Sequence, residues 1–321
     1  MIMETEHKDP HLLIEHSSTQ PHHHHDHAAV SQHFGGHHLL QVEGLSISFS
    51  MYDPFEPHFF RARHKQMDTI HDLHISVHAG EIVAIVGASG SGKTLLADAI
   101  LGLFASNALV KGRIWFDGVE QDPQTLAALR GQGISLVPQN INSLDPLLKV
   151  GRQIKGVKGD HNRMLALLAR YGLPQSVADL YPHELSGGMA RRVLLCCALM
   201  DDPKVIIADE PTPGLDPDLA QLALLDFRDF ADEGGGVLLI THDIELALRV
   251  ADRLAVFWEG TVVEETSVNS FSSPQNLKHP FSKALWYALP EHKFMVLEEP
   301  ESQENIESLE NHIVDRTDSH A

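Results

Sequence analysis

Short apolar runs punctuated by glycines recur along the chain and predict its main strands. Ile82–Val86, Val205–Ala208 and Val237–Ile240 are apolar throughout, which is typical of strands buried on both faces of a parallel sheet. Leu39–Phe49 and Ile70–His78 instead alternate apolar and polar residues, as half-exposed strands do. The pattern therefore predicts an α/β fold with a mainly parallel sheet covered by helices.

The segments between these runs predict further elements, each bounded by glycine, proline or a polar turn. We expect a loop over residues 50–68, a helix over 95–104, short strands over 112–118 and 133–139, mostly helix over 140–183, a hairpin joining 254–258 to 261–265, and a short helix between the prolines at 280 and 290.

Composition narrows the classes of partner. The 321 residues carry 24 Lys and Arg against 44 Asp and Glu, a formal net charge of −20, which argues against nucleic acid as a partner. We find neither an apolar run of about 18 residues nor a basic segment followed by an apolar core, so no membrane span or secretion signal is expected. The two cysteines, Cys196 and Cys197, are adjacent, which favours a reducing compartment.

Residues 1–38 are predicted to form a disordered tail, because they hold few apolar residues. Eleven of the 23 histidines fall here, interspersed with carboxylates. Two interpretations stay open: weak binding of Ni²⁺, Zn²⁺ or Co²⁺ by the imidazoles, or a solvated tail without a ligand.

A phosphate-binding loop follows the first buried strand. Gly87, Ala88, Ser89, Gly90, Ser91, Gly92, Lys93 and Thr94 match G-x-x-x-x-G-K-[ST] between a predicted strand and a predicted helix. Glycines and helix-start amides can approach phosphate oxygens closely. Lys93 is expected to reach the β- and γ-phosphates, and the Thr94 hydroxyl to ligate Mg²⁺.

Two more segments complete the candidate chemistry. The strand Val205–Ala208 ends in Asp209, expected to hold Mg²⁺, and Glu210, placed to polarise an attacking water. Ser186, Gly187 and Gly188 open an apolar helix and form a second anion-binding device.

The order of these motifs, with Leu185-Ser186-Gly187-Gly188 between the loop and the carboxylates, resembles the ATP-binding cassette family. The resemblance implies ATP and Mg²⁺ as cofactors, with an N-terminal antiparallel β subdomain and an α-helical subdomain beside the P-loop core. It assigns the Q-loop glutamine, which senses Mg²⁺ and the γ-phosphate, to Gln139, the D-loop aspartate to Asp216, and the γ-phosphate-contacting switch histidine to His242. Glu210, His242, Lys93 and Gln139 are then the expected catalytic residues, with Thr94, Gln139 and Asp209 as Mg²⁺ ligands.

One segment differs from the family pattern, and one family feature cannot be located in the sequence. Pro213-Gly214 stands where the D-loop usually has a small residue and Ala. The aromatic residue that stacks on adenine is not fixed by the sequence: Tyr52, Phe59 and Phe60 are candidates, whereas simple spacing indicates His64.

Three stretches, at 137–151, 181–189 and 279–290, resemble the ATPases of peptide and nickel importers more closely. This resemblance implies a head-to-tail dimer with a second ATPase subunit, two membrane permeases, a substrate-binding protein, and a peripheral position on the cytoplasmic face of the cell membrane. It divides the chain into a tail (1–38), an ATPase domain (39–270, helical subdomain about 140–190), an extension (271–292) and an acidic tail (293–321). The alternative is a non-transport cassette ATPase acting on nucleic acid or ribosomes.

Overall fold

A six-stranded, mainly parallel sheet forms the centre of the molecule. The computed structural model describes residues 37–52, 64–88, 90–156, 159–200 and 202–289. The strand order is β10-β9-β3-β8-β7-β6, in which only β10 runs antiparallel to its neighbour. The strands are β3 (Ile82–Gly87), β6 (Ile134–Val137), β7 (Val205–Asp209), β8 (Gly236–Thr241), β9 (Arg253–Trp258) and β10 (Thr261–Ser267). The prediction of a parallel sheet from the apolar runs is confirmed.

A second, antiparallel sheet of four strands has the order β2-β1-β4-β5. Its strands are β1 (His38–Tyr52), β2 (His64–His78), β4 (Ala108–Phe116) and β5 (Val119–Gln121). The expectation of a loop over residues 50–68 is wrong at both ends, since Ser50, Met51 and Tyr52 pair with Gln66, Lys65 and His64. Cross-strand hydrogen bonds extend the β1–β2 ladder here despite the nearby proline and aromatic residues, which predicted a loop.

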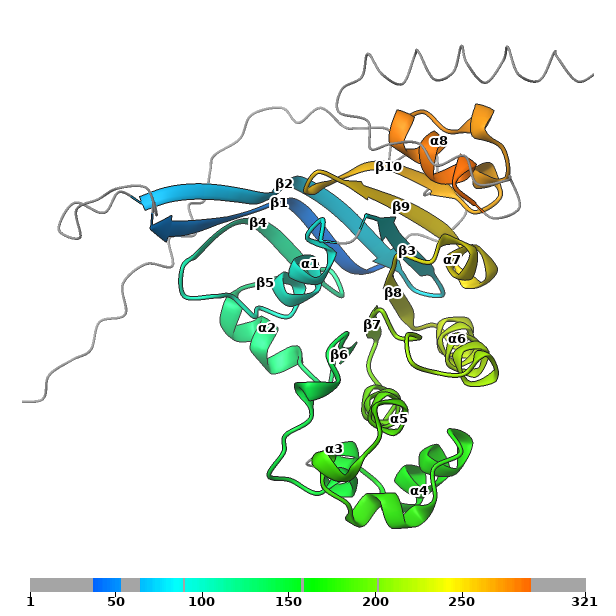
Figure 1. Cartoon of the computed structure of the whole chain (residues 1–321). Helices are drawn as coiled ribbons and strands as arrows, with labels where there is room; N and C mark the ends of the chain where they lie inside the picture. Colours follow the sequence, from blue (N-terminus) through cyan, green and yellow to red (C-terminus); the bar gives the residue numbers. More distant parts are fainter. Residues whose placement is uncertain (1–36, 53–63, 89, 157–158, 201, 290–321) are drawn as a thin grey trace, which may run out of the picture.

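Eight α-helices are described. They are α1 (Lys93–Ile100), α2 (Pro123–Leu129), α3 (Val150–Lys155), α4 (His161–Arg170), α5 (Gly187–Ala198), α6 (Pro217–Asp232), α7 (Ile244–Val250) and α8 (Pro280–Tyr287), with 3-10 turns at 141–143, 175–179, 182–184, 270–272 and 274–276. Helices α3, α4 and α5 lie together as a lobe apart from the antiparallel sheet (Figure 1). Within the described part of the chain, no helix has the length and apolar character that a bilayer crossing requires.

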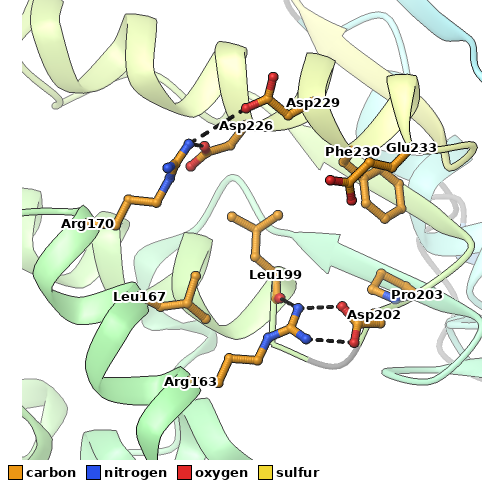
Figure 2. Close-up of a pocket in the computed structure, with 10 residues that line it drawn as sticks. All are labelled: Arg163, Leu167, Arg170, Leu199, Asp202, Pro203, Asp226, Asp229, Phe230 and Glu233. Atoms are coloured by element: carbon orange, nitrogen blue, oxygen red, sulfur yellow. Dashed lines mark hydrogen bonds and ion pairs between the residues drawn. The ribbon is translucent and has the colours of Figure 1, made fainter.

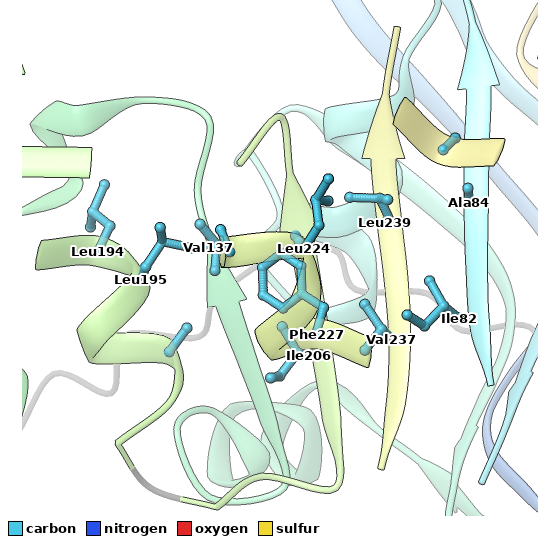
Figure 3. Close-up of a cluster of buried hydrophobic side chains, with 14 of the residues drawn as sticks. Ile82, Ala84, Val137, Leu194, Leu195, Ile206, Leu224, Phe227, Val237 and Leu239 are labelled. Atoms are coloured by element: carbon cyan, nitrogen blue, oxygen red, sulfur yellow. The ribbon is translucent and has the colours of Figure 1, made fainter. Parts of the chain in front are cut away.

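The six-stranded sheet separates two apolar cores. Alternate residues of β3 belong to different cores: Ile82 and Ala84 to one, Val83 and Ile85 to the other. Figure 3 shows the first core, where Phe227 of α6 packs against the sheet and Leu195 of α5 lies beside β6. The helical lobe therefore shares a core with the sheet, because the same cluster contains residues of α4, α5 and α6.

A buried ion network closes the amino-terminal end of the central strands. Glu81, which is fully buried, accepts hydrogen bonds from Arg253 Nε at 2.9 Å and from the His78 backbone N–H at 2.9 Å. Arg253 also donates to the Ser76 carbonyl and pairs with Glu265. Burial raises the pKa of Glu81, but the His78 hydrogen bond and the Arg253 charge outweigh it and leave the pKa below its ordinary value. The network ties β2, β3 and β9 together.

Replacing Glu81 by Gln should lower the free energy of unfolding by about 3–5 kcal/mol at neutral pH, because a buried charge pair is broken from one side. Since the folded-state pKa of Glu81 is lowered, this stabilisation is present above its ordinary value of about 4.3 and is lost as the pH falls through the lowered pKa. The difference between wild type and variant should therefore narrow in acid. Urea unfolding at neutral and acid pH measures it.

The control is Glu245→Gln, which breaks the exposed i,i+4 pair with Arg249 and should cost about 0.5 kcal/mol or less. If Glu81→Gln is as mild as this control, the network does not stabilise the fold.

Candidate functional site

The phosphate loop connects the end of β3 to the start of α1. Two positions require glycine. A Cβ on Gly87 would lie 2.2 Å from the Phe257 carbonyl oxygen. Gly92 caps α1 with a φ of 107°, a backbone conformation that residues with a side chain rarely adopt. The loop therefore keeps its backbone close to β9 and turns sharply into the helix. Ser89 lies outside the described residues.

Lys93 points into this loop. Its Nζ donates to the Gly87 carbonyl at 2.9 Å and to the Ala88 carbonyl at 2.7 Å, and 7% of the residue is exposed. Burial lowers the pKa of Lys93, while the Glu210 and Asp209 carboxylates act in the opposite direction. The ammonium group is thus positioned between the loop and the two carboxylates.

Asp209 and Glu210 leave the carboxyl end of β7. Asp209 is 2% exposed and accepts a hydrogen bond from the Thr94 side chain, yet burial and the Glu210 charge raise its pKa. Glu210 has a φ of 47°, an uncommon conformation for a non-glycine residue. Its Oε1 lies 2.7 Å from His242 Nδ1 and accepts the His242 backbone N–H at 3.0 Å.

These side chains come together because their strands are parallel neighbours. Lys93 follows β3, His242 follows β8, Asp209 and Glu210 end β7, and Gln139 follows β6, and these four strands are adjacent in that order. Carboxyl ends of parallel strands meet at one edge of the sheet. The exposed Gln139 lies next along this edge, since Val137 pairs with Ala208.

The donor set fits Mg²⁺. Asp209 Oδ1 and Glu210 Oε2 are buried and have no hydrogen-bond partner among the described residues, and buried polar oxygens normally have one. Asp209 Oδ1 and the Thr94 hydroxyl are ligands of the kind that a hard cation prefers, and the amide oxygen of Gln139, which follows the next strand, is a third.

The second predicted anion-binding segment lies at the start of α5 and consists of Ser186, Gly187 and Gly188. Ser186 caps α5, its Oγ accepting the Met189 N–H at 3.3 Å, and the two glycines begin the helix. Asp216 similarly caps α6 through the Leu219 N–H at 3.0 Å. No hydrogen bond or ion pair in the described part of the chain joins Ser186 to Lys93, and α5 lies with α3 and α4, away from α1 (Figure 1).

The sequence patterns missed two residues of the site. Asp98, one turn after Thr94 on α1, adds a charge that raises the pKa of Asp209, and its i,i+4 spacing from Thr94 was an available signal. Arg191 of α5 binds the backbone at Gln139, which no sequence signal revealed. The adenine-stacking candidates Phe59 and Phe60, and the side chains of Tyr52 and His64, lie outside the described part.

A separate hollow of about 310 Å³ lies between α4 and α6. Figure 2 shows Arg163 paired with Asp202, and Arg170 directed toward Asp226 and Asp229. Both guanidinium groups that line it are already paired with carboxylates, so this hollow is not suited to phosphate groups.

Comparison with known proteins identifies the family of this chain. The ABC transporter family model matches residues 70–213. The oligopeptide transport ATP-binding protein OppD of Lactococcus lactis subsp. cremoris is 39% identical over 269 residues, covering 78% of this chain and 76% of its own. The dipeptide transport ATP-binding protein DppD of Bacillus subtilis is 32% identical over 271 residues, covering 78% and 77%.

Solved structures give the same fold. The dimeric ATP-binding cassette MJ0796 bound to ADP and Pi superposes with a TM-score of 0.61 at 26% identity, covering 71% of this chain and 98% of that one. This likeness and the extent of the sequence matches lead to one assignment: the chain belongs to the ABC transporter family, as an ATP-binding subunit with a P-loop ATPase domain.

Proposed function

We propose that this protein is the ATPase subunit of an importer for peptides, working as a head-to-tail dimer with a second ATPase subunit. The observation that carries the proposal is the division of the site within one chain. The phosphate loop and catalytic carboxylates share one sheet edge, while the Ser186 segment begins α5 and has no described hydrogen bond to Lys93. A second chain is then needed to cover the γ-phosphate.

In the proposed complex, the loop from Gly87 to Thr94 grips the phosphates of ATP. Lys93 leaves its carbonyl partners for the β- and γ-phosphates. The residues that would hold Mg²⁺ are Thr94, Asp209 and Gln139, and the ion supplies charge neutralisation at the phosphates when bound. Ser186 and the amides of Gly187 and Gly188 contact the γ-phosphate of the ATP held by the partner.

Glu210 acts on water. Its carboxylate accepts a proton as the water oxygen bonds to the γ-phosphorus and the bond between that phosphorus and the β,γ-bridging oxygen breaks, giving ADP and phosphate. His242 is held against Glu210 Oε1 by two contacts, at 2.7 and 3.0 Å, so its ring is positioned relative to the base. Asp216, at the start of α6, lies in the D-loop and would face the partner.

The cargo and the partners are proposed from the relatives. Proteins named for oligopeptide and dipeptide transport are similar to this chain over 78% of its length, which supports two permeases and a binding protein as partners. Recruitment by permeases would place the chain at the cytoplasmic face of the cell membrane. Nickel chelates are a second cargo class, favoured by the eleven histidines of residues 1–38, a segment outside the described part apart from its last two residues.

Glu210→Gln should reduce ATP turnover by about 100-fold or more, because the general base is removed, while ATP binding persists. The variant should then accumulate as an ATP-bound dimer, measured by size-exclusion chromatography of the full chain with MgATP. Lys93→Ala is the control, expected to lose turnover and to stay monomeric. Normal hydrolysis by Glu210→Gln would assign the base to another residue.

Reconstitution with the permeases and binding protein tests the cargo class. We expect ATP hydrolysis in proteoliposomes to rise severalfold with an oligopeptide-loaded binding protein, because cargo binding promotes dimer closure. A Ni²⁺-chelate-loaded binding protein serves as the parallel arm. Stimulation by the chelate alone would replace peptides with nickel as cargo, and no stimulation by either would contradict the importer proposal.

A further inference from the structure

Arg191 joins the helix that begins at the Ser186 segment to the ATP site. It lies one helical turn after Gly187 on α5. Its Nη1 donates to the Pro138 carbonyl at 2.7 Å, and its Nη2 donates to the Gln139 carbonyl at 2.7 Å. One guanidinium group therefore binds two consecutive carbonyls of the Q-loop, the segment that follows β6.

These two carbonyls flank the Cα atom of Gln139. The Pro138 carbonyl belongs to the peptide plane before that Cα, and the Gln139 carbonyl to the plane after it. Because peptide units are planar, fixing both planes restricts the φ and ψ angles of Gln139. The direction in which the exposed Gln139 side chain leaves the backbone is then set by Arg191.

Arg191 places a charged guanidinium group in a buried position, where loss of water contact disfavours the charge. The residue is 6% exposed, and its Nε is buried without a hydrogen-bond partner among the described residues. Burial lowers the pKa of Arg191, and the Asp209 and Glu210 carboxylates act against that effect. An apolar side chain would fill this space without desolvation, so hydrogen bonding to the Q-loop and attraction to the site carboxylates are what the guanidinium adds.

We propose that Arg191 is a positioning residue that holds Gln139 toward the ATP site and couples this position to the first turn of α5. The proposal rests on the proposed function, in which Ser186, Gly187 and Gly188 contact the ATP of the partner subunit. Helix α5 is a rigid connection between those residues and Arg191. When the first turn of α5 contacts the ATP of the partner subunit, the contact is therefore transmitted to Gln139, which lies beside the ATP bound by its own chain.

Arg191→Met and Arg191→Lys test this in the full-length chain. Arg191→Met should lower kcat for ATP by about 10–100-fold, as loss of an orienting partner does, while the Kd for MgATP stays within about twofold because the phosphate loop is untouched. Arg191→Lys should recover part of kcat, since an ammonium group keeps the charge and can bind one carbonyl.

A double-mutant cycle separates positioning from general stability. If Arg191 acts through Gln139, adding Arg191→Met to Gln139→Ala should change kcat by no more than about twofold. The matched control is Arg130→Met, which removes a guanidinium from two other consecutive carbonyls, those of Leu101 and Gly102, at 2.7 and 3.0 Å. None of the described hydrogen bonds joins Arg130 to a site residue. The kcat of the Arg130→Met variant should therefore stay at the wild-type value.

Hydrogen exchange of the peptide covering residues 138–145 supplies a readout that needs no turnover. Exchange should accelerate in Arg191→Met and remain unchanged in Arg130→Met. Unchanged exchange, or additive effects in the cycle, would overturn the role of Arg191. Absence of hydrolysis by the wild-type chain alone and with its partners would instead contradict the proposed function, and the exchange data would still decide whether Arg191 holds the Q-loop.

Discussion

Burial of the central parallel strands on both faces is the constraint on which the rest of the structure depends. β3, β7 and β8 have no exposed residue along their lengths, so charged groups can be accommodated only where these strands end. At the amino-terminal end this produces the Glu81–Arg253 pair. At the carboxyl end it concentrates Lys93, Asp209, Glu210 and His242 in one place. The sheet thus separates a charged network that stabilises the fold from the charged groups of the ATP site.

The buried carboxylates at the carboxyl edge are not fully hydrogen-bonded within the described part of the chain. Asp209 and Glu210 face Lys93 and Arg191, but each carboxylate keeps one buried oxygen without a hydrogen bond in the described residues. The pKa of Asp209 is raised, since burial and the neighbouring carboxylates Glu210 and Asp98 disfavour its charge. A divalent cation would remove this repulsion, so binding of the metal and ordering of the site stabilise each other.

Most of the fold and of the site could be predicted where the signal is local. Apolar runs fixed the parallel strands, and the residues from Gly87 to Thr94 indicated their chemistry without any tertiary contact. The length of β1 and β2 could not be predicted, because pairing of Ser50 with Gln66 depends on a partner strand and not on local preference. The Arg191 contact escaped prediction for a similar reason, since its two acceptors are backbone carbonyls about 50 positions away and carry no sequence signature.

The position of β3 in the sheet has a consequence for synthesis of the protein. Its two neighbours are β8 and β9, so the strand that carries the phosphate loop finds no partner in this sheet until residues 236–258 have been made. At about 5–20 residues per second, translation of the intervening chain takes on the order of ten seconds. During that time Ile82–Val86 lacks both neighbouring strands of its sheet, although Val83 and Ile85 can already pack against the antiparallel sheet. The nascent chain is therefore exposed to aggregation in the interval before residues 236–258 emerge.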